Sequence, residues 1–412
     1  MGHLSKRTNI HFPERMIHMP FESIVITGTS CSGKSTIAKG LCNLDNKNTP
    51  HFKLVEAVTT REKRKDDTNY DYITDEYFNE LNVNNKLLIS SVYREKKYGL
   101  KFDSYREVLS EGNIPILIIT PSSAAELLSK NSDSYLCIFL DSPDDILTQR
   151  FEARNGVSLD NNSRDSFIKQ NINDRSNSSA AHYIISNNDE LTTMSLILWL
   201  WKNQYKGGGL PQRIIKDMVS CDVLLKNADP EMIKGASYDL CLGDEYYYDG
   251  EIQTLSAKKP FLTIEPYDYA IVSCKESACI PRDVIAKFGL SVGLFCQGII
   301  LSNGPQIDPG FSGTLFCLLF NTSNRAVHLK RGQHYATIEF NKLVGYADPY
   351  SGRYQGKEHI IDYIPANALH GAINELKKEV EKLKRESRYM QNIYLGVVAL
   401  MFAIISILLV VR

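Results

Sequence analysis

Residues 24–36 read IVITGTSCSGKST. A short β-branched apolar run leads into Gly28, and Gly33, Lys34 and Ser35 follow after four intervening residues. This is the phosphate-binding pattern G-x-x-x-x-G-K-[ST] in the setting that it requires, with a strand before it and a helix after it. The stretch therefore predicts an α/β domain that binds the phosphates of a nucleotide.

Each residue type in this loop has a chemical reason to be there. The two glycines allow backbone angles that point successive N–H groups at phosphate oxygens. Lys34 would neutralise the β- and γ-phosphates as a catalytic residue, and Ser35 would ligate Mg²⁺ at the start of the helix. The alternative is a plain turn rich in glycine and serine. The predicted phosphate-binding residues are Gly28, Thr29, Ser30, Cys31, Ser32, Gly33, Lys34, Ser35 and Thr36.

Length and composition limit the remaining possibilities. A chain of 412 residues is expected to form two or three domains. The formal net charge of −1 argues against general nucleic-acid binding, which needs a basic surface. The nine cysteines form no C-x-x-C pair, so we expect reduced core residues and neither a disulfide framework nor a zinc site.

The first segment, residues 18–205, alternates strand-like and helix-like stretches. Strands are predicted over residues 23–28, 114–120, 136–141 and 183–186, with helices over residues 123–129, 144–154 and 189–201 between and after them. This alternation is typical of a parallel sheet covered on both faces. Lys206 and the three glycines after it break the pattern and mark the first domain boundary.

After the phosphate loop, this segment contains VTTREKRKDDTNYDYIT at 58–74, Tyr98-Gly99, LDSPDDILTQRFEAR at 140–154 and HYIISNNDEL at 182–191. With these motifs, about 180 residues of the chain resemble guanylate kinases. The resemblance implies transfer of the γ-phosphoryl group of ATP, with Mg²⁺, to a small phosphorylated acceptor. Arg61, Arg64 and Tyr98 would bind the acceptor, and Arg150 and Arg154 would neutralise the moving charge. A solvated arginine face is the alternative.

The chain departs from that family where the acceptor base would be read. The family pattern has a glutamate before the Y-G-T motif and an aspartate in a neighbouring strand. This sequence has Ser90 and Thr120 at those places, and Leu100 in place of the threonine. We therefore expect phosphoryl-transfer machinery with an acceptor other than GMP.

The second segment, residues 210–365, consists of short alternating runs with frequent turn signals, which predict an all-β barrel or sandwich. It contains ASYDLCLG at 236–243, IPRD at 280–283, QIDPGFSG at 306–313 and GRYQG at 352–356. With these motifs, some 140 residues resemble the dCTP deaminase and trimeric dUTPase superfamily. The resemblance implies a nucleotide-binding homotrimer with Asp308 as a catalytic residue. The substrate-binding residues that it implies are Asp239, Ser291, Gln306, Ile307, Asp308, Tyr354 and Gln355.

The deaminase chemistry is not expected to survive in this segment. Leu318 stands where the deaminases have a glutamate that activates water, and leucine cannot move a proton. The triphosphate-binding R-S-S run keeps only Ser291. We expect this domain to bind a nucleotide without deaminating it, or only to trimerise.

The last two segments predict a stalk and a membrane anchor. In residues 366–392, Leu369, Ile373, Leu376, Val380 and Leu383 follow steps of four and three, which indicates a short coiled coil or a surface helix. Residues 393–411 contain no charge and would span about 28 Å as a helix, which predicts a single transmembrane helix. More lysine and arginine residues precede this predicted helix than follow it, which would keep the globular domains cytoplasmic.

Two functions agree with these features. The first is a membrane-anchored nucleotide enzyme that joins a kinase-like domain to a deaminase-like domain. The second is a nucleotide sensor or effector, in which a non-catalytic barrel passes its occupancy to the coiled coil and the predicted membrane helix. The intact phosphate loop favours the first, and the lost glutamate at position 318 favours the second.

Overall fold

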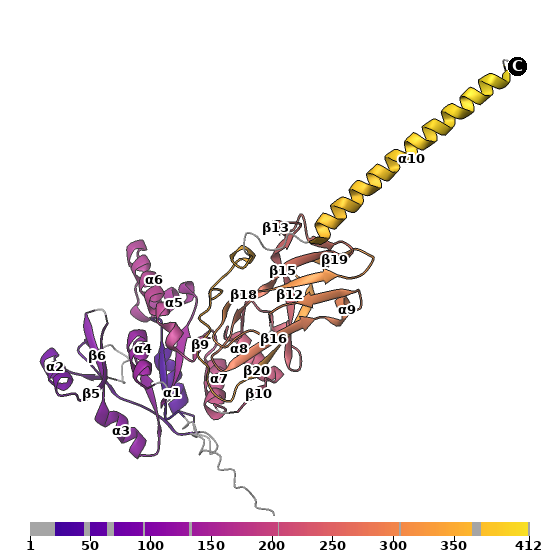
Figure 1. Cartoon of the computed structure of the whole chain (residues 1–412). Coiled ribbons are helices and arrows are strands. Elements are labelled where there is room, and N and C mark those ends of the chain that lie inside the picture. The colour runs from indigo at the N-terminus through magenta and orange to yellow at the C-terminus, as the bar shows by residue number, and fades with distance from the viewer. Residues whose placement is uncertain are drawn as a thin grey trace, which may run out of the picture.

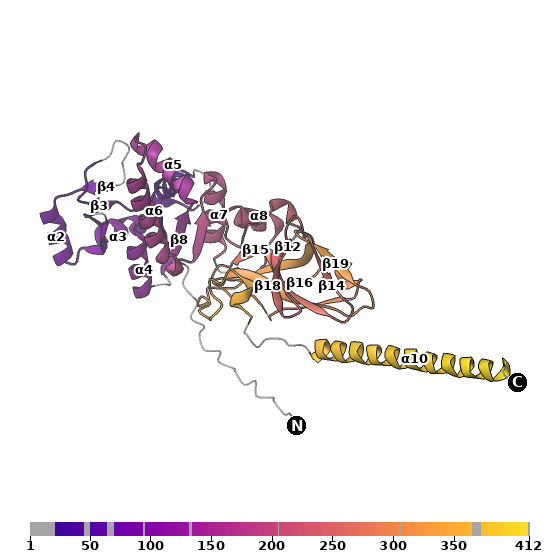
Figure 2. The same cartoon turned by 90° about the horizontal axis from the view of Figure 1, so that it is seen from above.

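The computed structural model describes residues 21–44, 50–63, 70–93, 95–131, 134–204, 206–304, 306–364 and 372–410. Within the last of these ranges, side chains are described from residue 379 to residue 404. An α/β domain and a β-rich domain lie side by side, and a long helix extends away from the β-rich domain in both views (Figures 1 and 2). Arg64 and Leu369 fall outside the described residues.

The first domain is built on a parallel five-stranded sheet in the order β2-β7-β1-β8-β9. Its strands are β1 (Ser23–Gly28), β2 (Phe52–Leu54), β7 (Ile114–Ile118), β8 (Tyr135–Asp141) and β9 (Tyr183–Ser186). Its helices are α1 (Lys34–Cys42), α3 (Phe102–Ser110), α4 (Pro121–Lys130), α5 (Asp144–Asn155), α6 (Asn161–Ser176) and α7 (Glu190–Lys202). The predicted α/β architecture of this segment is confirmed.

Strand alternation explains why helices cover both faces of this sheet. Along β1, Ile24 and Ile26 pack into a core with α1 and α7, whereas Val25 points to the opposite face and packs against α3 and α4. All three side chains are fully buried. A strand buried on both sides must be apolar throughout, as residues 24–26 are.

A smaller sheet lies beside the ends of these strands, in the order β4-β3-β6-β5. Its elements are β3 (Ala57–Thr59), β4 (Tyr70–Tyr72), β5 (Leu87–Tyr93) and β6 (Lys96–Lys101), with helix α2 (Asp75–Val83) against it. The β3–β6 and β5–β6 pairs are antiparallel. This sheet carries one wall of the first cavity described below.

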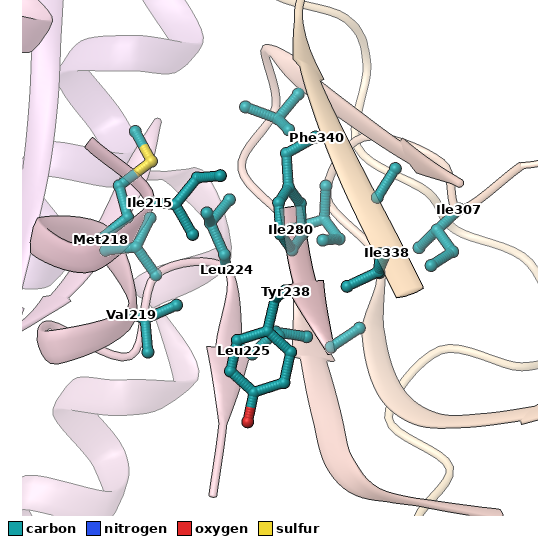
Figure 3. Close-up of a cluster of buried hydrophobic side chains, with 14 of the residues drawn as sticks. Ile215, Met218, Val219, Leu224, Leu225, Tyr238, Ile280, Ile307, Ile338 and Phe340 are labelled. Carbon is teal, nitrogen blue, oxygen red and sulfur yellow. The ribbon is translucent and has the colours of Figure 1, made fainter. Parts of the chain in front are cut away.

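The second domain is β-rich but opens with a helix, α8 (Gln212–Ser220), which the sequence reading had not predicted. Ile215, Met218 and Val219 on α8 face the sheet residues Tyr238 and Phe340 across a buried apolar cluster (Figure 3). Its strands are β10 (Gly208–Gly209), β11 (Leu225–Lys226), β12 (Ser237–Tyr248), β13 (Glu251–Thr254), β14 (Phe261–Ile264), β15 (Tyr269–Cys279), β16 (Val284–Leu290), β17 (Ile299–Ser302), β18 (Ser312–Asn321), β19 (Val327–Lys330) and β20 (His334–Lys342), with a one-turn helix α9 (Val292–Phe295).

These strands form a nine-stranded sheet whose main order is β10-β20-β12-β15-β18-β17, together with the two-stranded pair β14-β19. The central pairs β12–β15 and β15–β18 are antiparallel, and each contains a register shift. Gly208 pairs with Lys342 of β20, and Gly209 pairs with Asn341. The sequence had indicated only a break between domains at these glycines.

The two domains share one buried core. A single apolar cluster runs from Ile24 and Leu200 of the first domain to Ile215 and Phe340 of the second. Tyr183 of β9 donates its hydroxyl to the Asp283 carboxylate, and the Lys342 ammonium lies 2.6 Å from the same carboxylate. Asp283 and Lys342 are buried, so the interface between the domains contains a desolvated ion pair.

Helix α10 (Ala372–Val410) corrects the predictions for the end of the chain. No helix within the described residues is long and apolar enough to cross a membrane. The predicted transmembrane helix at 393–411, the membrane partner and the membrane localisation are therefore wrong. The coiled coil at 366–392 stays a prediction.

Candidate nucleotide sites

The phosphate loop adopts the backbone that its glycines predict. Gly28 and Gly33 have φ angles of 136° and 91°, and Cys31 between them has a φ of 66°. A Cβ atom on Gly28 would lie 1.9 Å from the carbonyl oxygen of Leu140 on β8, so no other residue fits there. β1 and α1 thus meet in a tight loop that opens into a cavity of about 710 Å³.

Lys34 begins α1 and reaches back over the loop. Its ammonium donates to the carbonyl oxygens of Gly28 at 3.0 Å and Thr29 at 2.6 Å. Burial lowers the pKa of Lys34 to about 8, and the nearby Asp174 carboxylate opposes that shift. An incoming phosphate would restore the charge that burial disfavours, which is the behaviour of a phosphate-binding lysine.

The predicted loop residues divide into two groups. Gly28, Ser30, Cys31, Lys34 and Ser35 line the cavity. Thr29 and Ser32 are buried and hold the loop together, since Thr29 donates to Asp141 at 2.9 Å and Ser32 donates to the Thr29 carbonyl. Gly33 packs against Asn187, and Thr36 lies exposed on the first turn of α1.

The walls of this cavity bring together most of the predicted acceptor residues. Arg61, Tyr98 and Arg154 line it. The Arg61 guanidinium lies 4.7 Å from the centroid of the Tyr70 ring. Arg150 is directed elsewhere, because its guanidinium donates to the Ser142 hydroxyl at 3.1 Å and to the Asn187 carbonyl at 2.9 Å. Its catalytic role stays a prediction, and it is placed to support the loop after β9.

Helix α6 is tied to the loop by polar side chains. Arg175 forms ion pairs with Asp141 at 2.8 Å and Asp144 at 2.9 Å, and these carboxylates raise its pKa. Asn171 accepts from the backbone N–H of Ser30 at 3.3 Å. Through these contacts the helix places Asp174 beside Lys34 at the phosphate end of the cavity.

The acceptor wall differs by one residue from the position that the family pattern predicted. Ser90, placed above at the glutamate position, lies on the other side of β5 and donates to Asn82 at 3.2 Å. The β5 residues that line the cavity are Ile89, Ser91 and Tyr93. The two-residue repeat of a strand could have distinguished Ser91 from Ser90 once the face of β5 was known. Thr120 lines the cavity as predicted.

A second cavity of about 440 Å³ lies in the β-rich domain and is mostly apolar. Phe316 and Leu318 of β18 form part of its wall, and aromatic residues of the following segment close over it. Tyr354 stacks on Tyr363 with ring centroids 5.3 Å apart, and Tyr350 meets Phe311 edge-on at 5.5 Å.

Four of the predicted residues of this domain line its cavity, namely Gln306, Ile307, Asp308 and Tyr354. Asp308 accepts from the Gln306 amide at 2.9 Å. The others have structural partners. Asp239 accepts from the Thr337 hydroxyl at 3.0 Å, Ser291 stands at the N-cap of α9, and Gln355 holds the hairpin through the Ser312 N–H and the Gly310 carbonyl.

The described residues contain no group of three or more histidine, cysteine, aspartate or glutamate side chains that could hold a metal ion. Ser35 lies exposed at the mouth of the first cavity. A single hydroxyl fits Mg²⁺, which is commonly held by one or two protein groups together with substrate phosphates.

Two family matches divide the chain at the same place as the structure. Residues 21–197 match the guanylate kinase family, and residues 210–343 match the dCTP deaminase-like family. All nine cysteines lie within the described residues and have free thiols, and Cys296 is exposed.

Individual relatives agree with this division. The second part is 37% identical over 140 residues to the dCTP deaminase of Thermococcus kodakarensis, covering 34% of this chain and 89% of that protein. It is 32% identical over 141 residues to the dCTP deaminase of Pyrococcus horikoshii, again covering 34% of this chain and 89% of that protein. The first part is 29% identical over 179 residues to the guanylate kinase of Rickettsia felis, covering 42% of this chain and 89% of that protein.

Proposed function

Because the chain belongs through residues 210–343 to the dCTP deaminase family and carries a guanylate kinase-like domain before it, we propose that it transfers the γ-phosphoryl group of ATP to a nucleoside monophosphate. The observation that carries this proposal is the single cavity that holds Lys34 at one end and Arg61 and Tyr98 in its walls. A donor phosphate and an acceptor phosphate could therefore meet in one cavity.

The residues of the cavity would act by positioning and by charge. The N–H groups of the loop around Gly28 and Gly33 would hold the β-phosphate, and Lys34 would bridge the β- and γ-phosphates. Arg61 would fix the acceptor phosphate, and Arg154 would neutralise charge on the group in transfer. Mg²⁺ bound with ATP would neutralise phosphate oxygens, and Ser35 is the residue placed to hold it.

We propose that the β-rich domain binds a nucleotide without deaminating it. Leu318 in the wall of its cavity offers no atom that can accept a proton from water. Among the described residues that line this cavity, Asp308 is the one carboxylate, and it is hydrogen-bonded to Gln306. Ile307 and the aromatic residues around Tyr354 provide apolar surface against which a base could stack.

The kinase proposal is tested with the full chain, ATP–Mg²⁺ and a panel of nucleoside monophosphates, with diphosphate products separated by chromatography. We expect one class of monophosphate to be phosphorylated, and Lys34→Ala to lower the rate by at least about a hundredfold, since it removes a charge that acts in the transition state. The affinity for ATP should fall as the pH rises above about 8, because the Lys34 ammonium of the ATP-free protein then loses its proton.

The matched control is Lys39→Ala on the same helix, which carries the same charge one turn further from the loop. Its activity should stay close to that of the unchanged protein. Absence of any phosphorylated product across the panel, with a working guanylate kinase in the same buffer, would contradict the proposal.

A further inference from the structure

Helix α10 exposes a long apolar surface. It extends away from the β-rich domain in both views (Figures 1 and 2). From residue 379 to residue 404 every side chain is exposed except that of Val398, which is partly buried. Helices in proteins owe most of their stability to the packing of an apolar face, and exposed apolar surface of this extent marks an interaction site.

One stripe of apolar side chains on α10 follows the spacing of a coiled coil. From Val380 onward, the positions of this stripe recur at alternating steps of three and four residues, with Ser387 at the one polar step. The exposed fractions of its apolar side chains lie between 41% and 70%. The spacing continues past residue 392, where the sequence analysis ended the predicted coiled coil. This stripe, called the seam below, comprises Val380, Leu383, Met390, Tyr394, Val397, Met401 and Ile404.

The charged residues beside the seam favour parallel helices. In a parallel coiled coil, the residue just before an a position faces the residue five places later in the neighbouring helix, and such pairs set partner choice and orientation. With Val380 at an a position, Glu379 of one copy would face Lys384 of another, which has the opposite charge. Glu386 would face Gln391, whose amide can donate to a carboxylate.

The apolar residues beside the seam favour the same orientation. Parallel helices would place Ile393 against Val398 of the neighbour, so that apolar flanks meet apolar flanks. Antiparallel helices that overlap over the same length would instead place Lys384 and Glu386 beside Leu400 and Val398. That arrangement would remove water from both charges without pairing them.

We propose that α10 is an interface between copies of this chain, whose helices associate in parallel and in register along the seam. The proposal commits to a second copy as the partner because one helix supplies both members of each complementary pair, the charged Glu379 and Lys384 and the apolar Ile393 and Val398. It goes beyond the proposed kinase function and does not depend on it.

The test is disulfide linkage between copies of the full chain. Leu383→Cys and Met401→Cys are each introduced on a Cys296→Ser background, because Cys296 is an exposed thiol. After mild oxidation, non-reducing gel electrophoresis measures the linked dimer. Each variant should link to itself, because equivalent seam residues of parallel, in-register helices lie close enough for a disulfide.

The matched controls are Arg385→Cys and Ala399→Cys, at exposed positions on the outer face of the same helix. They should give at least about fivefold less linked dimer, since outer positions lie beyond the Cα separation of about 7 Å that a disulfide can bridge.

Three results would overturn the proposal. Equal linkage at seam and outer positions would mean that the helices cluster without a defined interface. Linkage only when Leu383→Cys and Met401→Cys are coexpressed would mean that the helices lie antiparallel. Absence of linkage at both seam positions would mean that something other than a copy of this chain covers the seam.

Discussion

Leu318 is the residue on which the proposed loss of deaminase chemistry depends. It lies on β18 and pairs in register with Ser302 of β17. Both residues line the cavity, so position 318 faces the space where a base would bind. An alkyl side chain there favours binding of a flat, apolar ring face but cannot activate water.

We therefore predict that the full chain converts no dCTP to dUTP or dUMP. The measurement is chromatography of the nucleotides after incubation with protein at near-stoichiometric concentration, and an active dCTP deaminase serves as the positive control. If product forms, Asp308 must supply the base, and Asp308→Asn would abolish turnover whereas Asp348→Asn, outside the cavity, would not. Such turnover would contradict the prediction.

At the scale of the element, β9 and the residue before it connect the two domains. His182 pairs with β8, where its Nδ1 atom accepts from the backbone N–H of Cys137 at 3.0 Å. Its ring meets Phe21 with centroids 5.0 Å apart and Tyr346 at 4.6 Å. Burial lowers the pKa of His182 to about 3, and the charge of Arg282 acts in the same direction.

This pKa predicts an acid-sensitive contribution to stability. The unfolded chain takes up a proton on His182 below its ordinary pKa of about 6.5, whereas the folded chain does not until about pH 3. The stability from this residue is therefore fully present above pH 6.5 and is lost as the pH falls below it. Between pH 6.5 and pH 5 the loss should be about 2 kcal/mol.

The comparison variant is His182→Asn, whose side-chain oxygen can accept from Cys137 and does not titrate. Urea unfolding at pH 7 and pH 5 should give a smaller difference in the free energy of unfolding for this variant than for the unchanged protein. Equal differences in the two proteins would mean that His182 is protonated in the folded state.

At the scale of the whole molecule, the buried cluster of Tyr183, Asp283 and Lys342 lies where the two domains share their core. Burial raises the pKa of Asp283, while Lys342 and Tyr183 oppose that shift by stabilising the carboxylate. Removal of one partner would leave a charge without compensation in a desolvated interface.

We predict that Lys342→Met lowers the free energy of unfolding by about 3 kcal/mol or more. The double variant Lys342→Met, Asp283→Leu should recover much of this loss, because neither charge is then left unpaired. Urea unfolding measures both effects, and the control for loss of a lysine is Lys330→Met, because Lys330 is an exposed residue of β19. A double variant less stable than Lys342→Met would contradict this account.

The homotrimer implied by the second family stays a prediction.

The local pattern of the chain determined much of this protein. The spacing of Gly28, Gly33 and Lys34 predicted the loop, since glycine adopts the positive φ angles found at both positions without strain. The apolar run at 24–26 predicted a strand buried on both faces. Part of the second cavity, at residues 306–308, was implied by the resemblance to the second family. These signals are short-range, so they can be read before the fold is known.

Tertiary structure alone decided the rest. Only the pairing of β5 with β6 turned Ser91 into the cavity and Ser90 out of it, because a shift of one residue reverses the face of a strand. Asp239 and Arg150 were predicted as site residues from the motifs in which they stand. In the structure they bind Thr337 and Asn187, which come from distant parts of the chain. Likewise, Asp283 and Lys342 meet only when the two domains pack, since their interaction needs the desolvation that packing creates.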